Sequence, residues 1–183
     1  MTKKILTALG AILAFSAAPS AEAARGGGGG SGGVMLTANA FMYNQKIDNN
    51  GTEAEANTSI YDIKLGYLGG SGLYLGAIYS LKNTDDGTNK KDGSAYGGSI
   101  GYIGSRGFFI QGHYLASAKF DRYSDGSGYQ ADFGYMTSVS SSVLLGVELS
   151  YRSIEYKKDD NTSATISRKE TELTPKLTIG FAF

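Results

Sequence analysis

Apolar and polar residues alternate with a period of two in eight separate segments between Val34 and Phe183. Successive side chains of a β-strand point to opposite faces of the sheet, so this alternation predicts strands with one apolar and one polar face. The segments are 34–45, 60–68, 73–81, 96–102, 108–119, 129–135, 143–152 and 176–183. The 27 glycines and 13 tyrosines of the chain also favour an all-β fold with tight turns.

The connections between these segments alternate in length. Those near 69–72, 104–107 and 138–142 are short, whereas those near "KIDNNGTEAEAN", "KNTDDGTNKKDG", "DRYSDGSG" and "KKDDNTSATISRK" are longer, polar and charged. This alternation predicts an antiparallel up-and-down meander with four long loops at one end and both termini at the other end.

Residues 1–23 have the pattern of a secretory signal peptide. Lys3 and Lys4 precede the apolar run "ILTALGAILAFSAA", and an A-x-A site ends at Ala23. The run is too short for a transmembrane helix. Residues 24–33, "ARGGGGGSGG", predict a flexible tether, which leaves 34–183 as one barrel domain.

Charge and cysteine content exclude several classes of protein. Cleavage after Ala23 removes two lysines and one glutamate from 17 basic and 17 acidic residues, which leaves 15 and 16 and a formal charge of −1. A chain with this balance indicates no nucleic-acid partner. The absence of cysteine excludes disulfides and thiolate metal sites.

The polar face combines charged residues with glycine. Glycine weakens a strand and is a poor choice for a water-facing exterior, but it makes room for long side chains inside a narrow barrel. We therefore expect the polar face to line the lumen and the apolar face to contact lipid. The predicted lumen network is Asp62, Lys64, Asp132, Glu148, Arg152, Glu172 and Lys176, with Lys119 on the same face. The alternative is a soluble sandwich or lipocalin-like barrel with its apolar face inside.

Aromatic residues recur six positions apart on the apolar face. The pairs are Tyr61 and Tyr67, Tyr96 and Tyr102, Phe108 and Tyr114, and Tyr129 and Tyr135. Six residues of a tilted strand rise about 15 Å, so each pair would approach the two interfacial girdles of a membrane barrel.

These features together resemble the small eight-stranded outer-membrane barrels of the OmpA/OmpX type, over residues 34–183. The resemblance implies an eight-stranded transmembrane β-barrel in the cell outer membrane, with outer-membrane lipids as partners. It also implies that the barrel-assembly machinery recognises the C-terminal residues Leu177, Ile179, Phe181 and Phe183. The last strand would then pair with the first and leave no free edge.

Candidate catalytic residues are few. His113 and Ser117 share the polar face, but about 13 Å separates residues four apart on a strand, which is too far for a nucleophile and its base. "DDGTNKKDG" and "SDGSG" lack the ligand spacing of a calcium loop. The sequence thus predicts no catalytic, cofactor or metal residues.

The expected function is structural, or a surface interaction through the charged loops, because eight strands enclose a lumen that side chains fill. The alternatives are a narrow porin-like channel and a lipid-modifying enzyme. Pro175 cannot donate a ladder hydrogen bond, so we expect a bulge or frayed pairing there, towards the outer end of the last strand.

Overall fold

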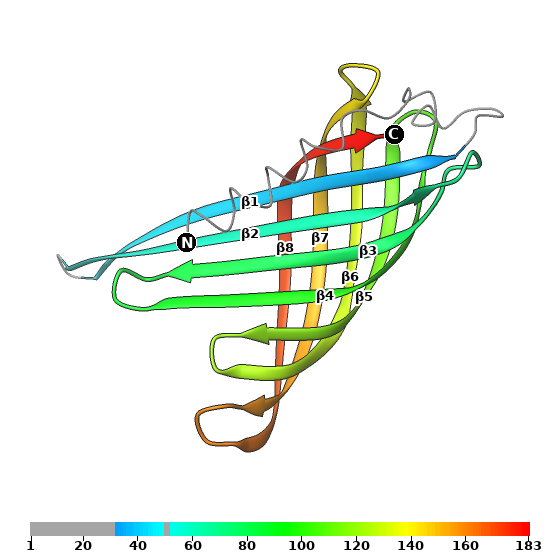
Figure 1. Cartoon of the computed structure of the whole chain (residues 1–183). Helices are drawn as coiled ribbons and strands as arrows, with labels where there is room; N and C mark the ends of the chain where they lie inside the picture. Colours follow the sequence, from blue (N-terminus) through cyan, green and yellow to red (C-terminus); the bar gives the residue numbers. More distant parts are fainter. Residues whose placement is uncertain (1–31, 50–51) are drawn as a thin grey trace.

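The chain folds into a closed barrel of eight antiparallel strands in sequence order (Figure 1). The computed structural model describes residues 32–49 and 52–183. The strands are β1 Gly33–Asn49, β2 Thr52–Leu68, β3 Leu73–Asp85, β4 Lys90–Ile103, β5 Phe108–Phe120, β6 Tyr123–Ser138, β7 Val143–Asp159 and β8 Ala164–Ala182. The predicted all-β, up-and-down architecture is confirmed. The expected signal peptide, residues 1–23, and residues 24–31 of the expected tether lie outside the described residues.

The long polar segments are strands and not loops. The strands contain 13 to 19 residues, which exceeds the ten or so expected from the alternating segments. β3 and β4 are joined by residues 86–89, β5 and β6 by residues 121–122, and β7 and β8 by residues 160–163. The prediction of four long loops was therefore wrong, because the ladder continues into the polar segments and ends in tight turns.

The turns at the opposite end are four residues long. Residues 69–72, 104–107 and 139–142 make these connections. Gly72 and Gly107 each adopt a positive φ, 88° and 90°, in which an L side chain would be strained. We call this end of the barrel the short-turn end and the other end the hairpin end. Among the described residues, no helix is long and apolar enough to cross a bilayer.

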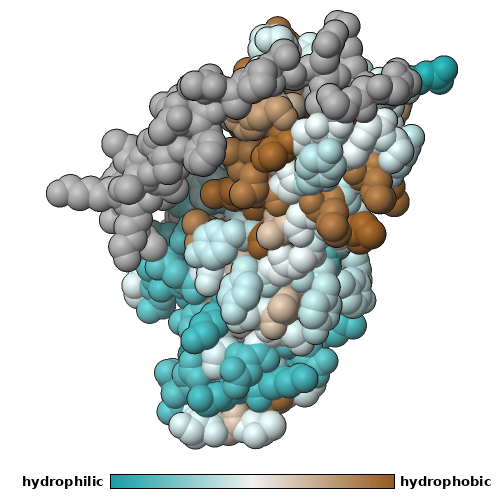
Figure 2. All heavy atoms as spheres, turned by 45° about the vertical axis from the view of Figure 1, so that its right-hand side comes forward, coloured by the Kyte–Doolittle hydropathy of each residue, from teal (hydrophilic) through white to brown (hydrophobic). Residues whose placement is uncertain are grey.

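The outward side chains form an apolar belt next to the short-turn end. Many large apolar residues point outward and are exposed. They include Leu65, Tyr67, Leu73, Leu75, Tyr79, Tyr96, Ile100, Tyr102, Phe108, Ile110, Tyr114, Tyr129, Phe133, Tyr135, Leu145, Val147, Leu149, Tyr151, Leu173, Leu177 and Ile179. Figure 2 shows hydrophobic residues gathered on the upper part of one face and hydrophilic residues below, towards the β7–β8 hairpin.

Aromatic residues border this belt at two levels. Tyr79 lies opposite Tyr96, and Tyr114 lies opposite Tyr129, on the side of the hairpin end. The Tyr129 ring centroid is 6.4 Å from that of Tyr151. Near the short-turn end, Phe108 packs edge-on against Tyr135 at 5.1 Å, and Tyr102 lies opposite Leu73. The spacing of six residues thus corresponds to two rows of rings around the wall.

Two apolar clusters fill the interior above and below a polar layer. One cluster lies at the short-turn end and consists of Met35, Leu68, Tyr74, Ile103, Phe109, Met136 and Leu144. The other lies towards the hairpin end and consists of Ile78, Ala95, Leu115, Ala118, Tyr123, Ile154 and Tyr156. Both clusters point inward, so the barrel contains a core as well as an apolar exterior.

Inward glycines make room for the large residues of the short-turn cluster. Gly66 and Gly76 lie opposite each other on β2 and β3. A Cβ on Gly66 would lie 2.6 Å from Cζ of Tyr74, and one on Gly76 would lie 2.7 Å from its Oη. A Cβ on Gly134 would similarly lie 2.5 Å from Cζ of Phe109. The glycines of the polar face therefore allow aromatic rings to cross the lumen.

A β-bulge on β5 reverses the expected orientation of Lys119. Tyr96 of β4 lies opposite Ser117 and Gly97 lies opposite Leu115, so one extra residue is inserted between them. Beyond the bulge Ala118 points inward and Lys119 is exposed. The expectation that Lys119 lines the lumen was wrong, because strict alternation fails across a bulge.

Pro175 leaves the β7–β8 ladder intact. The register between these strands runs without a shift from Val143↔Phe181 to Tyr156↔Arg168 and includes Leu149↔Pro175. The bulge or frayed pairing expected at Pro175 is therefore absent on the side of β7, and Pro175 lies in the middle of β8 instead of towards its outer end. Pairing between β8 and β1, in contrast, stops at Leu177, two residues away.

Candidate functional site: a buried ion-pair network

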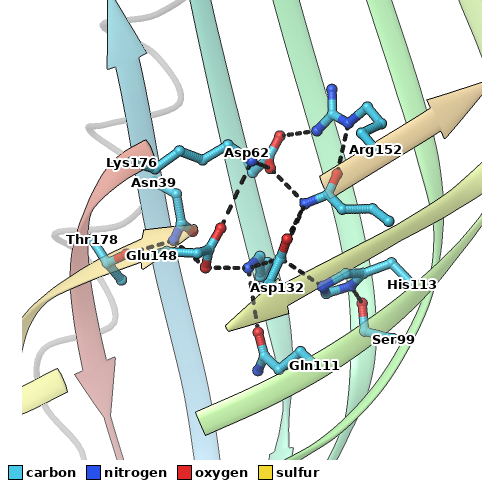
Figure 3. A network of polar contacts seen from close by, with 12 residues as sticks. Asn39, Asp62, Ser99, Gln111, His113, Asp132, Glu148, Arg152, Lys176 and Thr178 are labelled. Carbon is cyan, nitrogen blue, oxygen red and sulfur yellow. Dashed lines mark hydrogen bonds and ion pairs between the residues drawn. The ribbon is translucent and has the colours of Figure 1, made fainter. Parts of the chain in front are cut away.

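A layer of charged and polar side chains crosses the lumen between the two apolar clusters (Figure 3). Six of the seven predicted network residues meet in it, from strands β2, β6, β7 and β8. They are Asp62, Lys64, Asp132, Glu148, Arg152 and Lys176, and each is at most 5 % exposed. Each follows the inward alternation of its strand, which explains why widely separated residues converge.

Lys64 is the centre of one half of the network. Its Nζ lies 2.5 Å from Oδ2 of Asp132 and 2.7 Å from Oε2 of Glu148. It also donates a hydrogen bond of 3.3 Å to Oε1 of Gln111. One ammonium group therefore contacts two carboxylates and one amide, which uses its three donors.

Asp62 is the centre of the other half. Its Oδ1 accepts a hydrogen bond of 2.8 Å from Nη2 of Arg152, and its Oδ2 accepts one of 2.5 Å from Nζ of Lys176. Gln130 connects the halves, because its amide nitrogen lies 3.0 Å from Asp62 Oδ2 and 2.9 Å from Asp132 Oδ1. Arg152 Nε donates to Gln130 Oε1 at 2.7 Å.

The charges in this layer balance. Lys64, Lys176 and Arg152 carry three positive charges, and Asp62, Asp132 and Glu148 carry three negative charges, so the sum is zero. Buried charges are tolerated only when they are paired and hydrogen-bonded. The network therefore behaves as one neutral unit from which no single member can be removed without loss.

His113 extends the network towards β4. Its Nε2 lies 2.8 Å from Oδ2 of Asp132, and its Nδ1 lies 2.7 Å from Oγ of Ser99. A carboxylate only accepts hydrogen bonds, so a neutral His113 donates from Nε2 and accepts at Nδ1 from the Ser99 hydroxyl. Ser117, the partner considered in the sequence, takes no part in these contacts.

Ser99, His113 and Asp132 thus form a serine–histidine–carboxylate chain, the arrangement that activates a serine nucleophile in hydrolases. All three residues are at most 4 % exposed. Asp132 Oδ2 is shared with Lys64, so the carboxylate also balances a lysine. The two ring nitrogens are exchanged relative to a hydrolase triad, because Nδ1 faces the serine and Nε2 faces the carboxylate, and the serine hydroxyl is enclosed by the lumen.

Glu172 lies outside the central network. It pairs with Lys82, whose Nζ also lies 3.5 Å from Oε2 of Glu170. These side chains are 17 to 23 % exposed and lie nearer the hairpin end than the central network does. The Lys82 ammonium also lies 4.3 Å from the centre of the Phe120 ring. The prediction that Glu172 lines the lumen is compatible with this position, but its ion pair is a separate one.

The uncharged members of the network were not among its predicted residues, although His113 was placed on the polar face. Asn39, Gln111, Gln130, Ser99 and His113 all have hydrogen bonds within it, and Asn39 bonds Glu148 Oε2 at 2.9 Å and Thr178 Oγ1 at 2.7 Å. Their inward alternation was a sufficient signal. The predicted network contained only charged residues and therefore lacked these five.

Two oxygens of the network have no hydrogen-bond partner among the described residues. They are Asn39 Oδ1 and Glu148 Oε1. Lys176 Nζ lies 3.7 Å from Glu148 Oε1, close enough for charge attraction but too far for a hydrogen bond. Both atoms belong to residues near the β1–β8 boundary.

A second polar cluster lies at the rim of the hairpin end. The guanidinium groups of Arg122 and Arg168 lie 5.1 and 4.2 Å from the centre of the Tyr123 ring, and both donate to its hydroxyl. Arg122 pairs with Asp159 at 3.4 Å, and Arg168 pairs with Glu170 at 3.0 Å. This cluster fixes the hairpins relative to each other.

Within residues 32–49 and 52–183, no group of three or more histidine, cysteine or acidic side chains is arranged to hold a metal ion. In comparisons with known proteins, no protein-family model matches the chain, and no curated protein matches it in sequence. The geometry of the barrel therefore provides the basis for a functional proposal.

Proposed function

We propose that this chain is an integral outer-membrane β-barrel with a packed, non-conducting lumen, and that it has a structural role or a surface-interaction role. The observation that supports this proposal is that apolar side chains lie on the outside of the barrel and charged side chains lie inside. Leu177, Met42 and Leu75 are 71, 68 and 65 % exposed on the outside, whereas Lys64 and Asp132 are each 1 % exposed inside. A continuous exposed apolar surface of this kind marks contact with a membrane or a partner.

The dimensions of the belt support a bilayer. Two aromatic rows border it, and the six residues between them rise about 15 Å along a tilted strand, within an apolar band that is about 25 Å tall in membrane barrels. Closure of the sheet meets the need of backbone groups for internal hydrogen bonds, except at the β1–β8 boundary beyond Ala40 and Leu177. The outer membrane is the location that the resemblance to OmpA/OmpX-type barrels implies.

The filled interior favours the structural role over the channel. Two apolar clusters and a neutral ion-pair layer occupy the lumen in series. Ions crossing it would have to displace the network or the rings of Tyr74 and Phe109. The strands continue beyond Tyr151 to Asp159 on β7, a rise of about 20 Å, so charged hairpins would project outside the membrane and present the interaction surface.

The test is fractionation of cells that produce the full chain, followed by an SDS gel of heated and unheated samples. The expected result is recovery with the outer membrane and faster migration when unheated. Deletion of Phe183 should reduce assembly, measured as the amount of the fast-migrating form. Deletion of Ser140, in a short turn, is the control because it leaves the C-terminal signal unchanged. Recovery in the aqueous fraction without heat sensitivity would contradict the proposal, and planar-bilayer conductance of the folded protein would favour the channel.

A further inference from the structure

The boundary between β1 and β8 is paired over a shorter stretch than any other boundary of the described barrel. It contains the six pairs from Met35↔Ala182 to Ala40↔Leu177, next to reciprocal hydrogen bonds of 3.0 and 2.9 Å between Val34 and Phe183. Beyond Ala40, β1 continues to Asn49 and pairs there with β2, and β8 extends back to Ala164 and pairs there with β7. Figure 1 shows the two strands separating towards the hairpin end.

Pro175 explains where the pairing stops. The N–H of Phe183 donates to β1 and that of Ala182 donates to Ser142, on the side of β7. Because N–H groups alternate along a strand, odd-numbered residues of β8 face β1, and the next donor after Leu177 would be residue 175. The register places Met42 opposite this position. Proline has no N–H, so the next pair of hydrogen bonds cannot be completed.

The opening lies within the hydrocarbon depth of the belt. We call the region between Phe41 and Met42 of β1 and Leu173 and Pro175 of β8 the seam notch. Met42 and Leu173 point outward and are 68 and 64 % exposed, so the border of the notch is apolar. Residues of both edges, including Met42 and Pro175, also line a hollow on the outer face of the barrel.

The notch combines apolar walls with open polar groups. Phe41 and Tyr43 follow Asn39 in the alternation of β1 and so lie on the same side of the strand. Their rings stack in parallel with centroids 6.4 Å apart. The carbonyl of Pro175 and the backbone N–H of Leu173 face the missing partner. The two buried oxygens that lack a partner, on Asn39 and Glu148, belong to the part of the network nearest this boundary. Such groups at hydrocarbon depth are costly without hydrogen bonds.

We propose that the seam notch binds an amphiphile from the outer leaflet, with its hydrocarbon chain against Met42, Leu173 and Leu177 and its hydroxyl- or amide-bearing neck on the open backbone groups. This inference rests on the proposed membrane location. A hydrocarbon chain alone would leave the polar groups unsatisfied. An added β-strand fits less well, because the diverging edges allow it to pair with only one side and Pro175 provides no donor.

The experiment uses the full chain refolded in phosphatidylcholine vesicles that contain a photoreactive amphiphile. The probe is a long-chain fatty amide of serinol with a diazirine in its chain, and the control probe is a hydrocarbon of equal length with the same diazirine and no neck. Labelled residues are mapped by mass spectrometry. Labelling by the amide is expected to concentrate at residues 41–43 and 173–177 relative to Tyr96 and Tyr114 elsewhere on the outer face, whereas the control probe labels evenly.

Closing the notch provides the matched variants. Pro175→Val restores a donor towards Met42 and should lower the excess labelling about threefold or more, the factor that one net hydrogen bond provides. Ile179→Val, on the rung Ala38↔Ile179 that is already paired and lies outside the notch, should leave it unchanged. In a Met42→Cys/Pro175→Cys variant of this cysteine-free chain, residue 175 also gains an N–H, so labelling should be lowered as in Pro175→Val when the cysteines are reduced and lost when a disulfide closes the notch.

The outcomes separate the two proposals. Heat-dependent migration and vesicle insertion are measured in the same samples. A chain that fails to insert contradicts the membrane location and this inference with it. A chain that inserts and folds but is labelled evenly around the belt, or equally in the Pro175→Val variant, contradicts the notch alone.

Discussion

Replacement of Lys64 by methionine tests whether water is excluded from the lumen network. Methionine has a similar length but no charge, so the network would change from three positive and three negative charges to two and three. Asp132 and Glu148 would lose the ammonium that lies 2.5 and 2.7 Å from them. Removal of one partner from a buried ion pair destabilises a protein by about 3–5 kcal/mol, because a buried charge is left without compensation.

The assay is reversible urea unfolding in lipid vesicles, followed by migration on an unheated gel. Lys64→Met should lower the free energy of unfolding by about 3–5 kcal/mol. The double variant Lys64→Met/Glu148→Gln restores neutrality at two and two charges and should recover part of the loss. Lys91→Met is the matched control, because the Lys91 side chain is 40 % exposed and its Nζ lies 3.9 Å from Asp86, so its loss should cost less than about 0.5 kcal/mol.

The reasoning would be refuted by a loss below about 1 kcal/mol for Lys64→Met, the range of exposed ion pairs. Such a result would mean that water solvates Asp132 and Glu148 in the lumen, and a conducting barrel would then become the better proposal. A double variant that is less stable than Lys64→Met would contradict the charge-balance argument specifically.

Three further predictions concern other parts of the barrel. Ser99→Ala should destabilise the barrel by about 1–3 kcal/mol, because a buried histidine nitrogen loses its donor, and Ser99 in the wild type should resist a fluorophosphonate probe that would label an accessible nucleophile. Gly76→Ala should cost at least about 1–3 kcal/mol through overpacking in urea unfolding, whereas Gly98→Ala, where nothing lies within 4 Å, should be neutral. The pKa of Asp86 is lowered below its ordinary value of 3.8 by backbone N–H groups, so the β3–β4 turn should be stabilised above that value and loosen as the pH falls through the lowered pKa. Amide NMR signals of the turn should show this loosening, and Asp86→Asn should reduce its pH dependence, of which Asp85 supplies the rest because the N–H of Gly87 lowers its pKa too.

Much of the fold could be predicted because a period of two is a local property. The inward position of Asp132 follows from its neighbours on β6, and the outward position of Tyr135 follows from the same count. Eight such segments following one another along the chain leave few topologies. The lengths of the strands were less predictable, because a polar stretch such as "KKDDNTSATISRK" reads as a loop, although ladder pairing with its neighbour makes it a hairpin.

The site could be predicted less completely, because its contacts depend on strand register. The sequence places Ser99 and His113 on inward faces, but only the pairing Ser99↔His113 across β4 and β5 brings them together. The bulge that turns Lys119 outward has no clear sequence signal. Pro175 had one, but the sequence does not say whether its missing N–H would face β7 or β1, and that choice decides which ladder is interrupted.

The short β1–β8 boundary also affects how the barrel assembles. It joins Val34 to Phe183, the most distant partners in the described chain, whereas the other boundaries join neighbouring hairpins. The entropy of loop closure favours the local hairpins first, so this boundary should close last and, with few rungs, open first. Hydrogen–deuterium exchange should therefore be fastest, among the paired amides of the belt, at residues 36–40 and 177–181. The order in which the strands of the barrel pair and separate would then follow from the position of one proline.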